Sequence, residues 1–324
     1  MVPFVVWDIF FVLSSLCWHN FLMKFFTYIT CLNFYISFAL SQSYGVIGDA
    51  GHWNKNAKMV RDSIRSSGIT KLILPGDNIY DTTLEYEEVW SHWIKKGLDP
   101  FVVALGNHYR SIDEELQFFG MPYKYFSISE QGIKFIVLDS ETLTELDEQA
   151  VFLENELNSG EEIFRVIVFH HPPATISYRH GWKEREAFHL KMSPVFERSK
   201  DKINLIINGH DHLASLFSFN NIPVVVSGAV FESRPAPSFD YTREDGAIIK
   251  TQWANTEGFY WVRLDFDTKR ERIWINFVQA EKDEVSCSIL LFKNSILKKS
   301  NCLQLPAISE IPVFDQKQEQ NRTL

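Results

Sequence analysis

The chain has 324 residues, of which 45% are hydrophobic and 23% charged, and its formal net charge is −9. This length and hydrophobic share suit one large domain or two ordinary ones, and they exclude a disordered tail or a disulfide-stabilised miniprotein. The acidic balance, without a run of Lys and Arg, argues against binding of nucleic acid or of an anionic membrane surface.

Residues 1–41 form an apolar leader with only two charged side chains. From Met23 onward it reads as a signal peptide, with Ala39 and Ser41 at the −3 and −1 positions of a cleavage site. We therefore expect an export signal that starts at Met23, a secreted or periplasmic protein, and no stable membrane span after cleavage. The alternative is an uncleaved leader that anchors the protein, since about 20 apolar residues can span a membrane.

From residue 44 onward, short apolar runs alternate with amphipathic stretches, as in strands separated by helices on a layered sheet. The predicted strands cover 44–48, 71–74, 101–105, 123–129, 134–139, 164–169, 203–207, 213–219, 224–227, 259–267 and 271–278. The predicted helices cover 54–67, 85–96, 145–158 and 187–198. No repeat or linker interrupts this pattern, so we expect one domain over residues 42–280 and a C-terminal extension of unknown role over 281–324.

After the leader, the chain contains only two cysteines, Cys287 and Cys302. In an oxidising compartment a disulfide that closes this short loop is plausible and would act as a staple in the tail. Two unrelated buried thiols are the alternative.

Side chains that can bind metals fall in five groups, each directly after a predicted strand. The groups are Gly48-Asp49-Ala50-Gly51, Gly76-Asp77-Asn78-Ile79-Tyr80, Gly106-Asn107-His108, His170-His171-Pro172 and Gly209-His210-Asp211-His212. Ligands of open α/β sheets bind beyond the carboxyl ends of the strands, so these groups should converge. Each residue alone is more often a turn, cap or packing residue. Their joint spacing, with hard or borderline oxygen and nitrogen donors, indicates a dinuclear metal site.

These motifs make the chain resemble the calcineurin-like metallophosphoesterases, and among them the small, tartrate-resistant type of purple acid phosphatase. That family shows D-x-G, G-D-x-x-Y, G-N-H-D or G-N-H-E, V-x-x-H and G-H-x-H in this order. All five have counterparts here, in order, over about residues 44–215. The resemblance implies an α/β fold, a four-layer α/β/β/α sandwich of two mixed sheets flanked by helices.

The resemblance also implies seven metal ligands. A ferric site would be formed by Asp49, Asp77, Tyr80 and His212, and a divalent site by Asp77, Asn107, His170 and His210, with Asp77 bridging. The expected cofactors are two metal ions, Fe(III) and a divalent Fe, Zn or Mn. Phenolate and carboxylate ligands stabilise the harder, more highly charged ion, whereas an amide and two imidazoles suit a divalent one.

The first motif separates this chain from the phosphodiesterase and nuclease branches of the family. Those branches have D-x-H there, whereas this chain has Gly51, with His52 one position late. Tyr80 would supply the missing donor. We therefore expect visible absorption from tyrosinate-to-iron charge transfer.

The chain departs from the family pattern at three places. Tyr109 replaces the acidic residue after the G-N-H step, and Ile167 replaces Val. The third departure is the His170-His171 pair, in which counting from Val168 would make His171 the ligand. We choose His170, because His171 aligns with the Tyr of the family's His-Tyr-Pro; His171 would then support the ligand, face the substrate or serve in packing.

The expected reaction is in-line attack of a metal-bound hydroxide on phosphorus, with an imidazole that protonates the leaving alcohol. His108 is the first candidate, because it follows ligand Asn107; support of that ligand is the alternative. His180, ten residues beyond His170, is the second candidate, unless it is a surface residue. Imidazoles are partly protonated at mildly acidic pH.

We therefore expect an acid phosphatase that acts on small phosphate monoesters. A phosphodiesterase of the same fold, which acts on cyclic nucleotides or lipid head groups, is the nearest alternative, and a non-catalytic metal-binding module is a more distant one. The aromatic segment 231–253, with Arg234, Tyr241, Arg243 and Trp253, would either form a rim over the metals or be a surface excursion.

Overall fold

The computed structural model describes residues 41–177, 179–234, 239–255, 257–293, 295–300 and 302. The chain divides into two compact units, Met1–Ser41 and Gln42–Leu324. The predicted leader, apart from Ser41, lies outside the described residues, so the fold below is that of the second unit. Within the described ranges, none of the helices has the length and apolar character needed to cross a bilayer.

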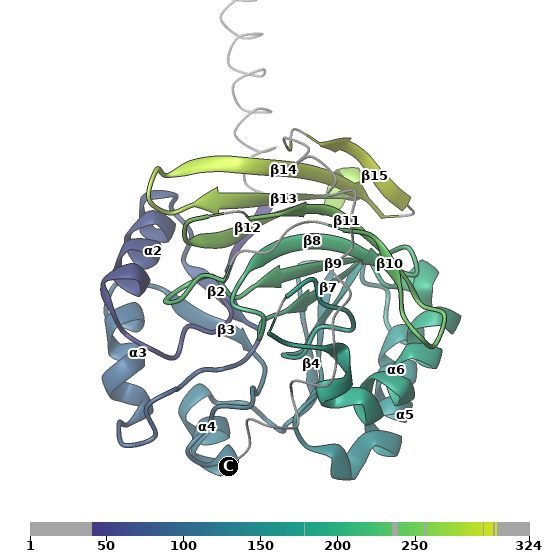
Figure 1. Ribbon diagram of the computed structural model, residues 1–324, viewed down its shortest axis with the longest axis horizontal. Coiled ribbons are helices and arrows are strands. Elements are labelled where there is room, and N and C mark those ends of the chain that lie inside the picture. The colour runs from purple at the N-terminus through teal and green to yellow at the C-terminus, as the bar shows by residue number, and fades with distance from the viewer. Residues whose placement is uncertain are drawn as a thin grey trace, which may run out of the picture. The chain divides into compact units, whose positions relative to one another are not determined.

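Two mixed β-sheets form the centre of this unit (Figure 1). In spatial order, the first sheet contains β15 (Ser295–Ser300), β14 (Glu284–Phe292), β13 (Arg272–Gln279), β12 (Tyr260–Asp267), β1 (Ser41–Val46), β2 (Lys71–Leu74) and β3 (Asp99–Val103). The second contains β10 (Tyr241–Thr242), β11 (Ile248–Ala254), β8 (Ala214–Phe219), β9 (Ile222–Ser227), β7 (Leu205–Asn208), β6 (Phe164–Val168), β5 (Ile133–Val137) and β4 (Phe126–Glu130). β1, β2 and β3 run parallel, as do β5, β6, β7 and β9.

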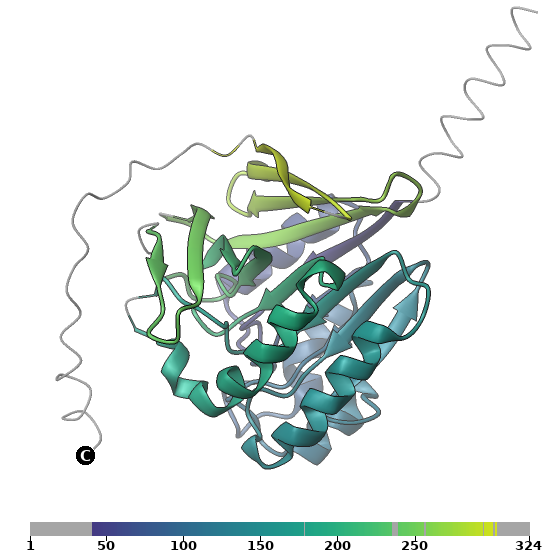
Figure 2. The same cartoon turned by 90° about the vertical axis from the view of Figure 1, so that its right-hand side faces the viewer.

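Helices cover the outer faces of the two sheets (Figures 1 and 2). They are α2 (Lys55–Ser66), α3 (Tyr86–Ile94), α4 (Ile112–Phe119), α5 (Leu146–Asn158) and α6 (Glu186–Arg198). α2 shows how such a helix forms: the Asn54 side chain caps its first turn, and Val60 and Ile64 are buried at helical spacing.

Three hydrophobic clusters define the layers. The largest lies between the sheets and combines residues such as Val46 and Leu264 of the first sheet with Val166 of the second. A second cluster packs the other face of the second sheet against α5 and α6, and a third packs the first sheet against α2 and α3. The predicted four-layer α/β/β/α arrangement is therefore confirmed.

The C-terminal strands belong to the first sheet. β14 pairs antiparallel with β13, and its Ile289 and Leu291 lie in the cluster between the sheets. The boundary predicted at residue 280 therefore falls at the turn between two paired strands. The described Cys302 forms a disulfide with Cys287 of β14, which matches the staple interpretation rather than two unrelated thiols.

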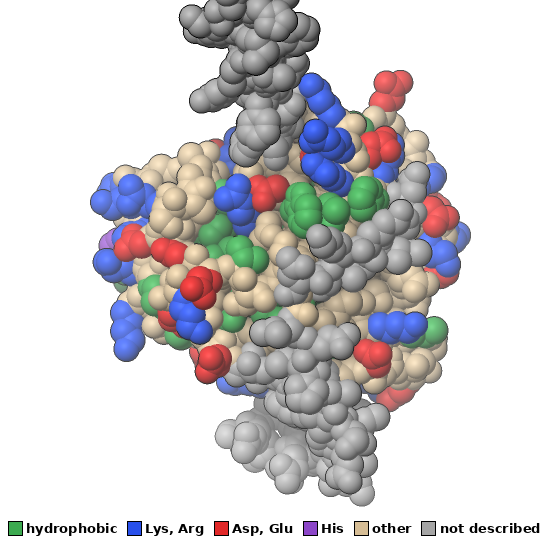
Figure 3. Space-filling view, turned by 90° about the horizontal axis from the view of Figure 1, so that it is seen from above, with side chains coloured by type: hydrophobic (Ala, Val, Ile, Leu, Met, Phe, Trp, Pro, Cys, Tyr) green, Lys and Arg blue, Asp and Glu red, His purple; other side chains and the backbone are tan. Residues whose placement is uncertain are grey.

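Charged side chains of both signs are spread over the face seen in Figure 3. Lys and Arg lie among Asp and Glu on the part of this face that the structure describes. Such mixing is typical of a solvated protein surface.

Candidate metal centre

The predicted metal-binding groups follow five parallel strands. Asp49 comes three residues after β1, Asp77 three after β2 and Asn107 four after β3. His170 and His210 come two residues after β6 and β7. The carboxyl ends of β1, β2 and β3 meet at one edge of the first sheet and those of β6 and β7 at one edge of the second. Contacts of His170 with Asp77 and Asn107 join the two edges.

The first donor set consists of Asp49, Asp77, Tyr80 and His212. The Tyr80 hydroxyl oxygen lies 3.0 Å from Asp49 Oδ1, 2.8 Å from Asp77 Oδ2 and 2.9 Å from His212 Nε2. His212 Nε2 is also 3.5 Å from Asp49 Oδ1. One phenol proton can serve only one of these neighbours, so the other donors face one another with lone pairs.

The second donor set consists of Asp77, Asn107, His170 and His210. Asn107 Oδ1 lies 3.1 Å from His170 Nε2 and 3.0 Å from His210 Nδ1. His170 Nε2 is also 3.2 Å from Asp77 Oδ1. Asp77 thus contributes one carboxylate oxygen to each set. We call the seven residues of the two sets the floor of the site: Asp49, Asp77, Tyr80, Asn107, His170, His210 and His212.

The outer contacts of the three floor imidazoles fix their tautomers. His170 Nδ1 lies 2.9 Å from the carbonyl oxygen of Pro75, which can only accept a hydrogen bond. His210 Nε2 lies 2.9 Å from Glu184, and His212 Nδ1 lies 3.1 Å from Glu232. Each imidazole therefore donates outward through one nitrogen and turns the other nitrogen inward, where its lone pair is available once that nitrogen is deprotonated, as in metal-bound histidines.

Burial and charge act on the floor in opposite directions. Desolvation raises the pKa of Asp49, which is fully buried. Burial also disfavours the charged form of His170, but the nearby carboxylates Asp77 and Asp49 outweigh it and raise the pKa of His170 to about 9. Burial lowers the pKa of His210 to about 4 and that of His212 to about 3. Two buried carboxylates without a Lys or Arg partner at the floor are what a bound cation would neutralise.

Close backbone packing explains why residue 51 is a glycine and not a histidine. A Cβ added there would lie 2.2 Å from the backbone nitrogen of Ile79. Two backbone hydrogen bonds join the loop after β1 to the loop after β2. The Gly51 amide donates to the Asp77 carbonyl oxygen at 2.9 Å, and the Gly51 carbonyl oxygen accepts from the Tyr80 amide at 3.1 Å. This close approach places the Tyr80 hydroxyl in the first donor set.

Four floor residues have a left-handed backbone. Asp49, Asp77, His210 and His212 have φ values of 54°, 56°, 71° and 52°, among nine non-glycine residues with positive φ in the described chain. Such conformations are uncommon for non-glycine residues and cluster at functional sites.

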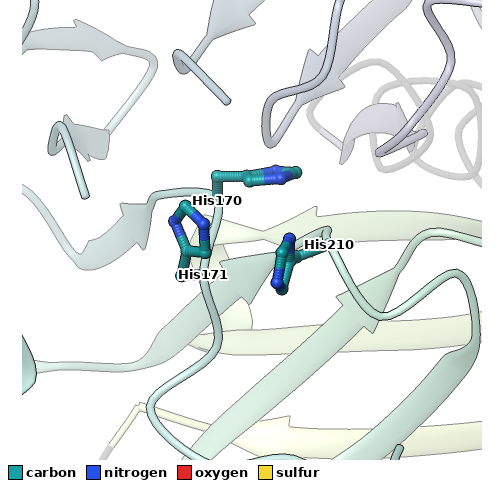
Figure 4. A group of neighbouring side chains, drawn as sticks. All are labelled: His170, His171 and His210. Carbon is teal, nitrogen blue, oxygen red and sulfur yellow. The ribbon is translucent and has the colours of Figure 1, made fainter. Parts of the chain in front are cut away.

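The geometry favours His170 over His171 as a member of the second donor set. His170 lies within 3.2 Å of both Asp77 and Asn107, whereas His171 Nδ1 lies 2.8 Å from the Ser140 hydroxyl. Figure 4 shows the rings of His170, His171 and His210 gathered at two strand ends, with possible ligand atoms within 4.8 Å of one another. His171 is thus a neighbour of the second donor set.

The two predicted proton donors lie beside the floor. The exposed His108 ring packs on Tyr80 with ring centroids 4.4 Å apart, and its backbone amide donates to Asp77 Oδ1 at 2.9 Å. The His180 ring packs on His210 with centroids 4.2 Å apart. His180 therefore lies against a residue of the second donor set.

Four residues form what we call the rim: His180, Glu184, Glu232 and Arg234. Glu184 accepts from His180 Nδ1 at 3.2 Å as well as from His210, and these contacts lower the pKa of Glu184 although burial opposes them. Sequence reasoning missed Glu184 and Glu232. The His-x-x-x-Glu spacing from His180 was the only local signal for Glu184, and Glu232 had none.

The aromatic segment 231–253 is divided between rim and fold. Phe231 packs on Tyr80 and His212 with ring centroids 4.8 and 5.3 Å apart. Arg243 is buried and Trp253 belongs to the cluster between the sheets. Among the described residues of this segment, those at its start lie at the site.

Comparison with known proteins identifies the family. The family model for calcineurin-like phosphoesterases matches residues 27–214, more than half of the sequence. The chain therefore belongs to the calcineurin-like phosphoesterases, a family that binds two metal ions. No curated protein sequence matches the chain significantly.

Solved structures share the fold at low sequence identity. GAP50, described as the anchor in the inner membrane complex of Plasmodium, has a TM-score of 0.62 and 16% identity over 80% of this chain and 90% of that one. The purple acid phosphatase PPD1 from yellow lupin (Lupinus luteus) seeds has a TM-score of 0.58 and 14% identity over 80% of this chain and 57% of that one. PhoD has a TM-score of 0.53 and 12% identity over 78% and 70%.

Proposed function

We propose that this calcineurin-like phosphoesterase is an acid phosphatase that hydrolyses phosphate monoesters at two metal ions. The observation that carries the proposal is the pair of donor sets that share Asp77 and turn three imidazole nitrogens inward. When bound there, two metal ions supply Lewis acidity, which polarises a phosphate ester and lowers the pKa of water. The fold shared with a purple acid phosphatase supports this assignment.

The donor chemistry suggests a different ion for each set. Tyr80 with Asp49 and Asp77 offers hard anionic oxygens, which suit Fe(III), and His212 completes the set. Asn107, His170 and His210 add neutral donors to Asp77, which suit divalent Fe, Zn or Mn.

His108 and His180 are the candidates for proton transfer. His108 is exposed and its ring packs on Tyr80, where it can donate a proton to a leaving alcohol. His180 is held by Glu184 beside His210, where it can orient a phosphate oxygen. We propose His108 as the main proton donor and His180 as the second.

Other functions make different predictions. A phosphodiesterase of the same fold would prefer bis(p-nitrophenyl) phosphate to p-nitrophenyl phosphate. A non-catalytic metal-binding module would be inert toward both when metal-replete; GAP50 is described as an anchor. Retention of all seven floor side chains in two compact sets favours an enzyme.

Metal analysis combined with a visible spectrum tests the centre, and assays on the two esters test the reaction. We expect two metals per chain, one of them iron, and a visible band that disappears in Tyr80→Phe. The band should persist in the control His92→Ala, because His92 lies on α3 and its ring stacks on Trp53. A colourless, iron-loaded and active protein would contradict the ferric assignment.

We also propose that the protein is exported. The apolar leader motivates this, and the Cys287–Cys302 disulfide is typical of oxidising compartments. Sequencing of the amino terminus of the exported protein should give Gln42 as the first residue, whereas an end at Met1 would contradict cleavage.

A further inference from the structure

We propose that Arg234 selects the dianion of a phosphate monoester over the monoanion of a diester. The inference rests on the proposed function, because it concerns the substrate class of the same site. It starts from the position of one guanidinium group at the rim.

Arg234 is tied to the floor residue His212 in two ways. Its backbone amide donates to the His212 carbonyl oxygen at 2.7 Å. Its side chain pairs with Glu232, which accepts from His212 Nδ1 at 3.1 Å. The guanidinium is therefore positioned by the same carboxylate that orients a floor imidazole.

Glu232 occupies only part of the guanidinium. Nε and Nη2 of Arg234 donate to the two Glu232 oxygens at 2.9 and 2.6 Å. Nη1 instead makes a long contact, 3.4 Å, with His180 Nε2. The two hydrogen bonds to Glu232 fix the orientation of the guanidinium, and Nη1 can still donate a hydrogen bond to an anion.

The Nη1 edge of Arg234 contacts His180, which lies beside the second donor set. His180 packs on His210 of the second donor set, and Phe231, three residues before Arg234, packs on Tyr80 of the first. The Arg234 side chain is 24% exposed, so solvent screens it less than a surface arginine. A phosphate bound at the floor would therefore have a fixed cation beside its peripheral oxygens.

A cation at this position discriminates by charge. Above its second pKa of about 6, a monoester phosphate carries nearly two negative charges, whereas a diester carries one, so the charge difference is tested at neutral pH. The attraction of a fixed guanidinium for the first is correspondingly larger. A diester also replaces one charged oxygen with an alkoxy group, which accepts hydrogen bonds from Nη1 less well.

The test compares Arg234→Gln with Arg263→Gln in the metal-loaded protein. Arg263 is a matched control, because its side chain is 33% exposed and pairs with Asp265, a carboxylate two residues away, on β12. We would measure kcat and KM for p-nitrophenyl phosphate and its bis ester, metal content, and binding of inorganic phosphate by calorimetry.

For Arg234→Gln we expect kcat/KM for the monoester to fall about 10- to 100-fold, and that for the diester to fall less than about threefold. Phosphate binding should weaken by a factor similar to that for the monoester, with metal content and Arg263→Gln kinetics unchanged. Arg234→Lys, which keeps the charge but not the fork, should recover only part of the loss. Equal losses for both esters, or unchanged phosphate binding, would overturn the proposal.

The outcome for Arg234 can be separated from that of the proposed function. If the wild-type protein hydrolyses neither ester, the phosphatase assignment fails. Phosphate binding to wild-type and Arg234→Gln protein then still decides whether Arg234 contributes to an anion site.

Discussion

The floor and the rim of the site are built in different ways. The floor side chains follow strand ends, are mostly buried, and are oriented by backbone groups such as the His210 amide, which donates to Asp49 Oδ2 at 2.8 Å. The rim residues come from a 3₁₀ turn (Trp182–Arg185) and from the loops near His180 and after β9, and their side chains are 19–43% exposed. The comparison indicates that sheet topology places the candidate metal-binding side chains, whereas loops place the side chains around them.

This difference has a measurable consequence. Substitutions in the floor should remove bound metal together with activity. Substitutions in the rim should leave most of the metal in place and change affinity or substrate choice.

The largest effect is expected for Asp77→Asn, because Asp77 serves both donor sets. Losing a charged oxygen from each set should reduce kcat/KM on the order of 10³-fold or more and lower the content of both metals. Metal analysis beside monoester kinetics measures both. Full metal content with near-normal activity would show that Asp77 does not bridge.

His108→Ala tests the boundary between the two regions, because His108 follows a floor residue but is exposed. Removing the imidazole should lower kcat about 10²-fold while metal content stays unchanged. His92→Ala, a histidine on the outer helix α3, is the control. Unchanged turnover in His108→Ala would remove His108 from proton transfer.

Glu184→Gln tests whether a rim carboxylate supports a floor ligand. The amide weakens the charged hydrogen bond to His210, so metal affinity at the second set should fall about 10- to 100-fold, and excess metal should restore activity. Competition with a chelator gives the affinity. The control Glu154→Gln, which breaks an exposed ion pair with Arg198, should bind metal like the wild type. Equal metal affinity in Glu184→Gln and Glu154→Gln would show that Glu184 does not support the floor.

Glu115→Gln extends the comparison to the layer beneath the floor. Glu115 is buried and accepts from Asn78 Nδ2 at 2.7 Å and from the Tyr86 hydroxyl at 2.8 Å, and burial raises its pKa from 4.5 to about 7. The folded state thus favours neutral Glu115, and its contribution is fully present below pH 4.5 and is lost as the pH rises through about 7.

In the wild type, the free energy of unfolding should therefore decrease by on the order of 3 kcal/mol from Glu115 between about pH 4.5 and pH 8. Glu115→Gln should lack this part of the pH dependence. Urea denaturation at pH 5 and pH 8 measures it in both proteins. Identical pH dependence would show that Glu115 titrates normally.

The floor was predictable from sequence, and most of the rim was not. Floor residues such as Asp77 and Asn107 stand at fixed offsets from apolar runs, so each motif carries its own structural context. Glu184 and Glu232 act through contacts with residues 26 and 20 positions away, which depend on how two loops fold back over the sheet. Nothing in the sequence around Glu184 and Glu232 specifies how these loops fold over the sheet.

The elements show the same division. The parallel strands β2 and β6 have compact apolar runs and were predicted within a residue of their observed bounds. The short helix α4 was missed, although Ser111 caps its first turn and Gly120 ends it in a left-handed conformation. β14 was also missed: its first residues, Glu284 and Val285, are exposed, and its pairing with β13 makes it part of the sheet.

The left-handed backbone at the floor determines which variants give interpretable results. At His212, with φ of 52°, replacement by alanine or valine would disturb the loop as well as remove the imidazole. Asparagine and glycine tolerate this conformation, so His212→Asn or His212→Gly changes chemistry with the least change in shape. The left-handed backbone thus limits which substitutions at His212, engineered or natural, leave the conformation of the loop unchanged.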